Sequence, residues 1–316
     1  MANSVSLIIT SYNQIDYLKD AVGSALAQSV PFHEVIVVDD ASEDGSVSWL
    51  ENVAAQNANV TVHVHNKNMA VGIARNSGLD LCTGTYVGFL DGDDMIEPHC
   101  HASWQNLVAS DAPDMCVFGL NILDQESGTF VERTVSTPFA GEVVPDCGPT
   151  DDDDVVAACF ALMPSAWRKL YRRGFLEDKE IRFQPGIYED VIYHFQTLTL
   201  CETLTSTPEK LINYRKHRAS VLRTPSRQHF ALIEVFARAN ELMENHAGHR
   251  PALLEAFRRF RLRLLLFSVH SRERIREEDR QEFAKRVLSV PGLTDVDLAH
   301  DMQDLLASAK GIAGQK

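Results

Sequence analysis

Short apolar runs alternate with stretches of helical periodicity through the first 120 residues of the chain. Runs that are apolar throughout are typical of strands buried on both faces. Their alternation with helical patterns predicts βαβ units in a largely parallel sheet that helices cover on both sides. The expected strands are residues 5–9, 35–38, 60–65, 86–90 and 115–118, and the expected helices are residues 17–28, 47–55, 71–81 and one that begins at Pro98.

The pattern changes after residue 120. Between about residues 121 and 160 the periodicity fades and Gly, Pro and Asp become frequent, which predicts a loop-rich insertion. The aspartate run 151–154 is compatible with a metal site, but consecutive like charges more often lie in a solvated loop, the interpretation we favour. Beyond Thr224 the sequence is charged and helical. We therefore expect a domain of residues 1–224 and a C-terminal helical subdomain of residues 225–316.

Composition and charge narrow the class of protein. The 316 residues are 45% apolar, which suffices for one sizeable core and a smaller appendage. A formal net charge of -14 argues against a nucleic-acid partner, because binding phosphates needs a basic surface. The six cysteines include no C-x-x-C pair, which argues against a disulfide framework or a zinc site. With no signal-peptide or membrane-span pattern, we expect a cytoplasmic protein.

Polar residues directly follow the first two expected strands. Ligands of open parallel sheets bind beyond the carboxyl ends of the strands, so these positions are candidates for binding. Residues 10–13, Thr-Ser-Tyr-Asn, follow the first strand in place of a glycine-rich phosphate loop. Asp39 and Asp40 follow the second strand, where a carboxylate can accept a hydrogen bond from a base imide or a ribose hydroxyl. Capping of the next helix is the alternative role for either aspartate.

An acidic turn, Asp91-Gly92-Asp93-Asp94, follows the expected strand 86–90. Three acids within four residues repel one another unless a cation lies between them. Mg²⁺ and Mn²⁺ take carboxylate oxygens and leave positions open for substrate phosphates, so a metal-diphosphate site is one interpretation. An acidic turn without a ligand is the other. An EF-hand is excluded, because two positions that need acids hold Met95 and Ala102.

Four segments resemble, in order and spacing, the signature segments of the family 2 inverting glycosyltransferases of the GT-A fold. They are residues 5–13, 37–42, 72–78 and 89–94, and the resemblance extends over roughly residues 5–220. It implies a GT-A type, Rossmann-like α/β domain with a mostly parallel sheet flanked by helices. Residues 1–120 would bind the nucleotide-sugar, and residues 121–224 would form the acceptor side and supply the catalytic base.

The resemblance also implies an activity. The enzyme would be a metal-dependent hexosyltransferase or N-acetylhexosaminyltransferase that moves a sugar from a UDP-sugar to a hydroxyl acceptor with inversion. Its acceptor would be a glycan or a lipid-linked molecule in the assembly of surface polysaccharide, teichoic acid or lipid-linked glycan.

Individual roles follow from the same resemblance. The implied nucleotide-sugar ligands are Thr10, Tyr12, Asn13, Asp40, Arg75, Asp91 and Asp94. Among them Tyr12 would offer its ring face to the base, Asp40 would accept from the base imide, and Arg75 would reach the base or the diphosphate. Asp91 would hold the ribose, and Asp94 could face the acceptor. Asp93, together with Asp91, would bind Mn²⁺ or Mg²⁺ that neutralises the departing diphosphate.

The segment 186–191, Gly-Ile-Tyr-Glu-Asp-Val, resembles the Glu-Asp segment of the same family at the start of a helix. By that resemblance Asp190 is the base that takes the acceptor proton, and Glu189 orients nearby groups. Paired acids at a helix N-terminus are also favourable without catalysis. Downstream, Arg215, His217 and Ser220 lie in a segment that resembles the region closing over the donor, where they would contact the diphosphate. A solvated basic loop is the alternative there.

Two further patterns have open interpretations. The His-x-His pairs at residues 63/65 and 99/101 have metal-like spacing, but isolated pairs of this kind are more often structural or exposed, as we expect here. The segment 258–267 is both basic and apolar, so it could rest on an anionic membrane at the inner face. Packing on its own domain, or on a second subunit in a homo-oligomer, is the alternative that we favour.

Two other functions compete with glycosyl transfer. A sugar nucleotidyltransferase would need a glycine-rich, basic triphosphate loop near the N-terminus, which residues 10–14 do not provide. A catalytically inactive nucleotide-sugar or carbohydrate-binding module would not need the acid expected to act as base at Asp190. We therefore expect an active glycosyltransferase.

Overall fold

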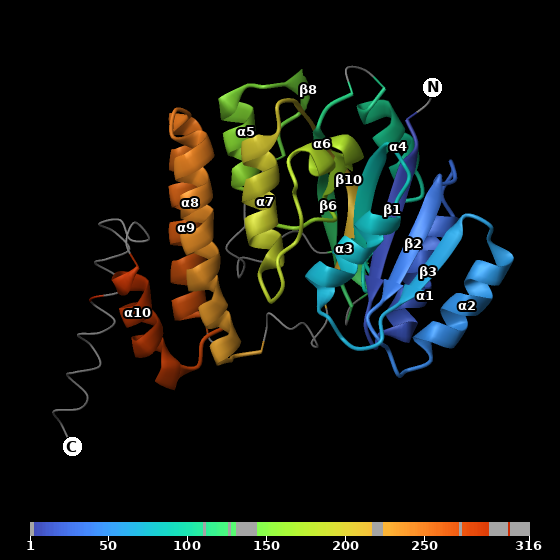
Figure 1. Cartoon of the computed structure of the whole chain (residues 1–316), viewed down its shortest axis with the longest axis horizontal. Helices are drawn as coiled ribbons and strands as arrows, with labels where there is room; N and C mark the ends of the chain where they lie inside the picture. Colours follow the sequence, from blue (N-terminus) through green and yellow to red (C-terminus); the bar gives the residue numbers. More distant parts are fainter. Residues whose placement is uncertain are drawn as a thin grey trace.

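A computed structural model describes residues 3–109, 112–125, 128–130, 144–216, 224–271, 274–290 and 303. Within them, ten strands form one sheet in the order β3-β2-β1-β4-β9-β6-β10-β5, with β7 beside β6 and β8 beside β10. Helices lie on both sides of this sheet (Figure 1). The expected α/β fold class is confirmed.

The N-terminal half is a parallel βαβ array. Its strands are β1 (Val5–Ser11), β2 (Glu34–Asp39), β3 (Val60–Val64) and β4 (Tyr86–Asp91), and its helices are α1 (Ile15–Leu26), α2 (Ser46–Gln56) and α3 (Val71–Leu81). All seven residues of β1 are buried, which explains why the strand is a continuous apolar run. The chain passes from β1 out to β3 and returns to β4 on the other side of β1, so right-handed crossovers place α3 on the face opposite α1 and α2.

The second half of the sheet is mixed. Its elements are β5 (Met95–Ile96), α4 (Cys100–Leu107), β6 (Met115–Asp124), β7 (Thr129–Phe130), β8 (Cys147–Thr150), α5 (Asp153–Phe160), β9 (Lys169–Arg172), α6 (Arg173–Asp178), α7 (Glu189–Leu200) and β10 (Leu204–Lys216). Strand β9 lies between β4 and β6 and runs antiparallel to both, whereas β10 pairs with β6 in parallel.

The expectation of loops over residues 121–160 is partly wrong. Strand β6 continues to Asp124, and β8 and α5 occupy residues 147–150 and 153–160. Only the second half of the aspartate run lies in α5: the Asp152 side chain caps the helix by accepting a hydrogen bond from the Asp154 N–H at 2.8 Å. Acidic residues in a first helical turn are favoured by the helix dipole. Residues 131–143 lie outside the described part.

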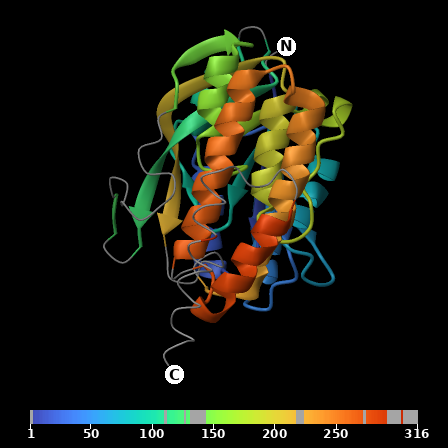
Figure 2. The ribbon, with the colours of Figure 1, turned by 90° about the vertical axis from the view of Figure 1, so that its left-hand side faces the viewer.

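Helices follow β10 as expected. They are η2 (Arg227–Phe230), α8 (Ala231–Ala247), α9 (Pro251–His270), η3 (Glu277–Asp279) and α10 (Arg280–Ser289). Figure 2 shows α5, α7, α8 and α9 side by side, and α8 packs on α7 while α9 packs on α5. The division of the chain at residue 224 stays a prediction.

Helix α9 contains the basic and apolar segment 258–267. The buried apolar side chains of this helix include Phe257, Phe260, Leu264 and Leu265, which belong to the core of the chain. This is the packing on its own domain that we favoured, while contact of the segment with a membrane or a second subunit stays a prediction. In the described residues, no helix is both long and apolar enough to span a bilayer.

Candidate active site

The pairing of β1 with its neighbours brings three strand ends together. In register, Thr10 of β1 lies opposite Asp91 of β4, and Ser11 lies opposite Asp39 of β2. The Asp40 N–H donates to Ser11 O at 2.8 Å, which continues the ladder beyond the strands. The residues expected to bind the nucleotide and the metal therefore lie at one edge of the sheet, where ligands of parallel sheets bind.

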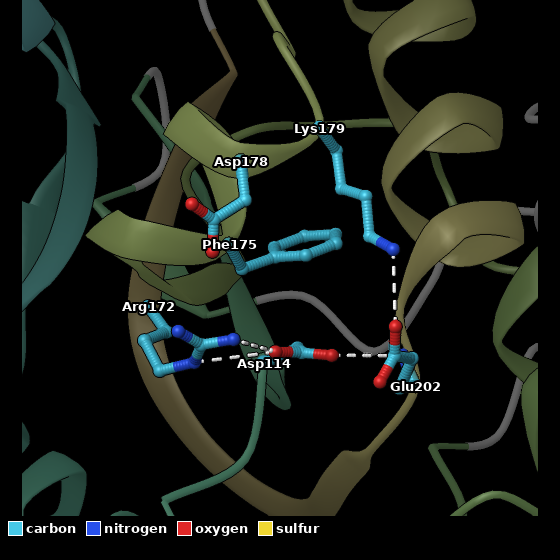
Figure 3. A pocket seen from close by; sticks show the side chains of 6 residues that line it. All are labelled: Asp114, Arg172, Phe175, Asp178, Lys179 and Glu202. Atoms are coloured by element: carbon cyan, nitrogen blue, oxygen red, sulfur yellow. Dashed lines mark hydrogen bonds and ion pairs between the residues drawn. The ribbon is translucent and has the colours of Figure 1, made fainter.

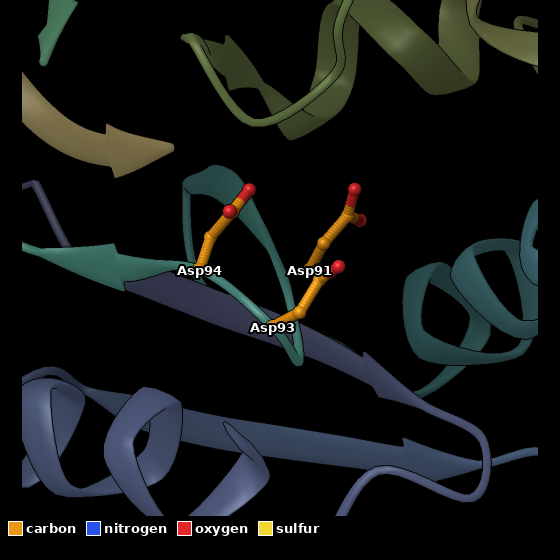
Figure 4. Close-up of side chains that lie close together, drawn as sticks. All are labelled: Asp91, Asp93 and Asp94. Carbon is orange, nitrogen blue, oxygen red and sulfur yellow. The ribbon is translucent and has the colours of Figure 1, made fainter. Parts of the chain in front are cut away.

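The acidic turn after β4 is tightly packed against the end of β1. A Cβ atom on Gly92 would lie 2.4 Å from Gln14 Nε2 and 2.7 Å from Thr10 O, so only glycine fits there. The Gly92 N–H also donates to Thr10 O at 2.9 Å. In Figure 4 the side chains of Asp91, Asp93 and Asp94 point to the same side of the turn.

These three carboxylates form a donor set that suits a hard divalent cation. Their ligand oxygens lie within 4.8 Å of one another. Asp94 Oδ1 accepts from the Arg215 N–H at 2.8 Å, whereas Asp94 Oδ2 is buried without a hydrogen-bond partner among the described residues. Burial, and then the charges of Asp93 and Asp91, raise the pKa of Asp94 well above its ordinary value. A cation would offset this repulsion, so the residues fit Mn²⁺ or Mg²⁺.

Arg75 connects the acidic turn to the start of α7. Its Nη2 donates to Asp91 Oδ1 at 2.7 Å, and its Nη1 donates to Glu189 Oε1 at 2.9 Å and Asp190 Oδ1 at 2.7 Å. The Arg75 side chain is only 2% exposed, so these ion pairs are weakly screened by solvent. The contact of Arg75 with a base or diphosphate stays a prediction. In the structure, the buried guanidinium of Arg75 is shared by the acidic turn and the Glu189–Asp190 pair.

Asp190 and Glu189 occupy the first turn of α7. Tyr188 precedes them in the left-handed region, with a φ of 65°, and the chain turns there into the helix. Burial raises the pKa of Asp190 to about 7, although the nearby charge of Arg75 opposes the shift. The Asp190 side chain remains 19% exposed. A partly accessible carboxylate with a pKa near neutrality has the properties of a general base.

Tyr12 and Asn13 follow β1: Tyr12 has an exposed ring, and Asn13 connects the loop after β1 to the loop after β2. Tyr12 is 47% exposed at the sheet edge, and Thr10 is buried. Asn13 has a φ of 49°; its N–H donates to Ser42 Oγ at 2.8 Å, and its Oδ1 accepts from the Glu43 N–H at 2.7 Å. Asn13 thus holds the loop after β1 against the loop after β2, and Tyr12 has the exposure that stacking on a base requires.

The two aspartates at the end of β2, Asp39 and Asp40, have different environments. Asp39 accepts hydrogen bonds from both the N–H and the hydroxyl of Ser42, so it forms a turn before α2 and does not cap that helix, whose N-cap residue is Gly45. Asp40 Oδ1 accepts from the Met69 N–H at 2.8 Å and lies 2.7 Å from His65 Nδ1. The structure therefore separates a turn-forming Asp39 from an Asp40 that faces the loop after β3.

The contact between His65 and Asp40 is not predicted by the sequence pattern. His65 directly follows β3, and its N–H donates to Asp39 O at 2.9 Å. The βαβ order of the sequence could have suggested this contact: consecutive parallel strands are usually neighbours, so the residues that follow them lie side by side. His101, in the other His-x-His pair, is buried and hydrogen-bonds to Val30 O, as the structural interpretation expects.

Arg215 lies near the acidic turn, and its guanidinium contacts side chains of α1; its contact with a diphosphate stays a prediction. Its Nη2 donates to Asp20 Oδ2 at 2.9 Å, and its Cζ lies 4.9 Å from the centre of the Tyr17 ring. The Arg215 N–H is the group that contacts Asp94. His217 and Ser220, the other expected diphosphate ligands, lie outside the described residues.

Two cavities lie away from this site. The smaller, about 190 Å³, is lined by Asp114, Arg172, Phe175, Asp178, Lys179 and Glu202 (Figure 3). Asp114 and Glu202 precede β6 and β10, so this cavity is at the opposite edge of the sheet from the acidic turn. Its Lys179 and Glu202 form an ion pair at 3.0 Å. The larger cavity, about 500 Å³, lies beside α5 and also includes Glu202.

The sequence of this chain is similar to those of known glycosyltransferases. The sequence model described as Glycosyl transferase family 2 matches residues 6–168. The uncharacterized glycosyltransferase EpsJ of Bacillus subtilis (strain 168) is 28% identical over 70% of this chain and 63% of its own length. Chondroitin synthase of Escherichia coli is 31% identical over 43% of this chain and 20% of its own length. The chain thus spans less than two thirds of either relative.

The fold has a close structural counterpart. The crystal structure of S. aureus TarS residues 1–349 in complex with UDP-GlcNAc matches with a TM-score of 0.74, covering 93% of this chain and 82% of that one. The two sequences are 18% identical, so the match shows the fold, which is of the GT-A type.

Proposed function

Because the chain belongs to glycosyl transferase family 2, we propose that it transfers a hexosyl or N-acetylhexosaminyl group from a UDP-sugar to a hydroxyl acceptor with inversion. The observation that carries this proposal is the buried Arg75, which joins the acidic turn to the Glu189–Asp190 pair. Asp91, the proposed donor ligand, and Asp190, the proposed general base, thus contact the same guanidinium.

The reaction requires a base on the acceptor side. The acceptor oxygen attacks the anomeric carbon, the bond from that carbon to the diphosphate oxygen breaks, and the hydroxyl proton passes to the Asp190 carboxylate. Attack from the face opposite the diphosphate inverts the anomeric centre. Arg75 and Glu189 would position the Asp190 carboxylate through the shared guanidinium.

Asp91 and Asp93 would hold Mn²⁺ or Mg²⁺, which would supply positive charge next to the diphosphate as it departs. Support for this role comes from the close grouping of the three carboxylates and from the buried Asp94 Oδ2, which has no hydrogen-bond partner in the part of the chain that the structure describes. Asp94 would lie beside the ion and face the acceptor.

Uracil is the proposed base of the donor, and a growing glycan is the proposed acceptor. The structural counterpart TarS is named in complex with UDP-GlcNAc, and the relative from Escherichia coli is named as a chondroitin synthase. On this chain Tyr12 would stack on the base, and Asp40 would accept from its imide. Surface polysaccharide, teichoic acid or lipid-linked glycan assembly, in the cytoplasm, is the proposed setting.

A binding and transfer screen tests the function. We expect the purified chain to bind UDP-sugars in the presence of Mn²⁺ and to release UDP when a suitable glycan acceptor is added. Calorimetry with a panel of nucleotide-sugars, followed by mass spectrometry of the acceptor, measures both steps. Binding of no nucleotide-sugar, with or without the metal, would contradict the proposal.

Asp40→Asn should weaken UDP binding by about tenfold or more, because a hydrogen bond to a charged group contributes roughly 1.5–3 kcal/mol. The substitution keeps the size of the side chain and removes its charge. Asp16→Asn, at an exposed residue of α1, is the matched control and should leave affinity unchanged. Equal affinity of the parent protein for UDP and GDP would refute the proposed uracil selectivity.

A further inference from the structure

We propose that His65 determines the base specificity of the site by limiting how many hydrogen bonds Asp40 can accept from a base. The inference rests on the function proposed above and concerns the same nucleotide pocket. It follows from the distribution of hydrogen bonds over the two oxygens of one carboxylate.

The two oxygens of Asp40 differ in their contacts. Oδ1 accepts from the Met69 N–H at 2.8 Å and lies 2.7 Å from His65 Nδ1. Among the residues that the structure describes, none donates a hydrogen bond to Asp40 Oδ2. A carboxylate oxygen has about two lone-pair sites, so Oδ1 is fully used and Oδ2 is available to a ligand.

The histidine ring is fixed at both nitrogens. A carboxylate accepts hydrogen bonds and donates none, so His65 Nδ1 carries the proton shared with Asp40. In the neutral ring Nε2 is then an acceptor, and it lies 2.9 Å from the Ser77 hydroxyl of α3. The His65 and Asp40 side chains are 10% and 4% exposed, so solvent competes little with this arrangement.

A carboxylate with one available oxygen distinguishes the bases. Uracil presents a single ring N–H between two carbonyls and needs only one acceptor. Guanine presents a ring N–H beside an amino group, a pair that binds best to two carboxylate oxygens. Cytosine presents a ring nitrogen lone pair, which Oδ2 repels. With Oδ1 taken by His65 and Met69, the second donor of guanine stays unpaired, and uracil is favoured.

The test compares nucleotide selectivity in variants of the full chain. His65→Leu opens a lone-pair site on Asp40 Oδ1, so we expect the ratio of UDP affinity to GDP affinity to fall about tenfold, the usual effect of one charge-assisted hydrogen bond. His65→Asn keeps an N–H donor near the position of Nδ1 and should retain most of the selectivity. His33→Leu, at an exposed histidine, is the matched control and should behave as the parent.

Calorimetric titrations of UDP, GDP and CDP with Mn²⁺ present give the required ratios. A purely structural role for His65 would weaken all three nucleotides equally, so an unchanged UDP-to-GDP ratio in His65→Leu overturns the inference and leaves the proposed function intact. A parent protein that binds no nucleoside diphosphate, or that binds UDP and GDP equally, overturns both. Circular dichroism of each variant checks that the fold is retained.

Discussion

Asp190→Asn should lower the rate of glycosyl transfer by about 10²–10⁴-fold, the usual contribution of a general base, while nucleotide-sugar affinity stays close to that of the parent protein. A hydroxyl is a poor nucleophile until its proton is removed, and Asn has the size of Asp without its basicity. Arg75 keeps Asp91 and Glu189 as partners in this variant, so the donor side of the site should stay in place.

The pH dependence of the parent protein should identify the same group. The base acts in its deprotonated form, and burial raises the pKa of Asp190 to about 7 against the opposing charge of Arg75. The value of kcat/KM should therefore rise as the pH increases through about 7 and level off above it. In Asp190→Asn this rise should disappear.

Paired measurements separate binding from chemistry. Metal-dependent nucleotide-sugar affinity is measured by calorimetry and turnover by UDP release. Asp178→Asn, at an exposed acid of α6, is the matched control and should leave both unchanged. Turnover near the parental value in Asp190→Asn would move the base to Glu189 or Asp94 and contradict this assignment.

Local patterns predicted much of the N-terminal half of the fold. Helix α3 was expected at residues 71–81 and begins and ends there, because its apolar residues recur at helical spacing between a polar loop and a buried strand. Strand β6 was expected to end at residue 118 but continues to Asp124. Its last six residues, Gly-Leu-Asn-Ile-Leu-Asp, mix apolar and polar types. They are strand because β10 pairs with them as far as Lys216, a contact between distant segments.

In the candidate site, too, the residues could be predicted from local sequence, whereas the contacts between them could not. Arg75, Glu189 and Asp91 were each expected in the site on the basis of their segments. That Arg75 would join the other two was not predictable, since Arg75 and Glu189 are 114 residues apart in the sequence. Asp39 and Asp40 are identical in type and adjacent, and only the contacts of the loops after β2 and β3 separate their roles.

Asp93→Ala should abolish the metal-dependent part of UDP-sugar binding. The acidic turn places three carboxylates within 4.8 Å, and burial together with the charges of its neighbours raises the pKa of Asp94. Removing one carboxylate relieves the repulsion and at the same time removes an oxygen ligand. The apo protein should therefore tolerate the change, whereas the affinity for a cation and for the diphosphate next to it should collapse.

The measurement is calorimetric titration of UDP-sugar into the parent protein and Asp93→Ala, with Mn²⁺ and then with EDTA. The parent should lose most of its affinity in EDTA, and the variant should show the weak, EDTA-insensitive binding that remains without a cation. Asp151→Ala removes an exposed carboxylate from the chain's other acidic run and should respond to Mn²⁺ as the parent does. If EDTA leaves parental affinity unchanged, the acidic turn holds no catalytic metal, and Asp93 would contact the donor directly.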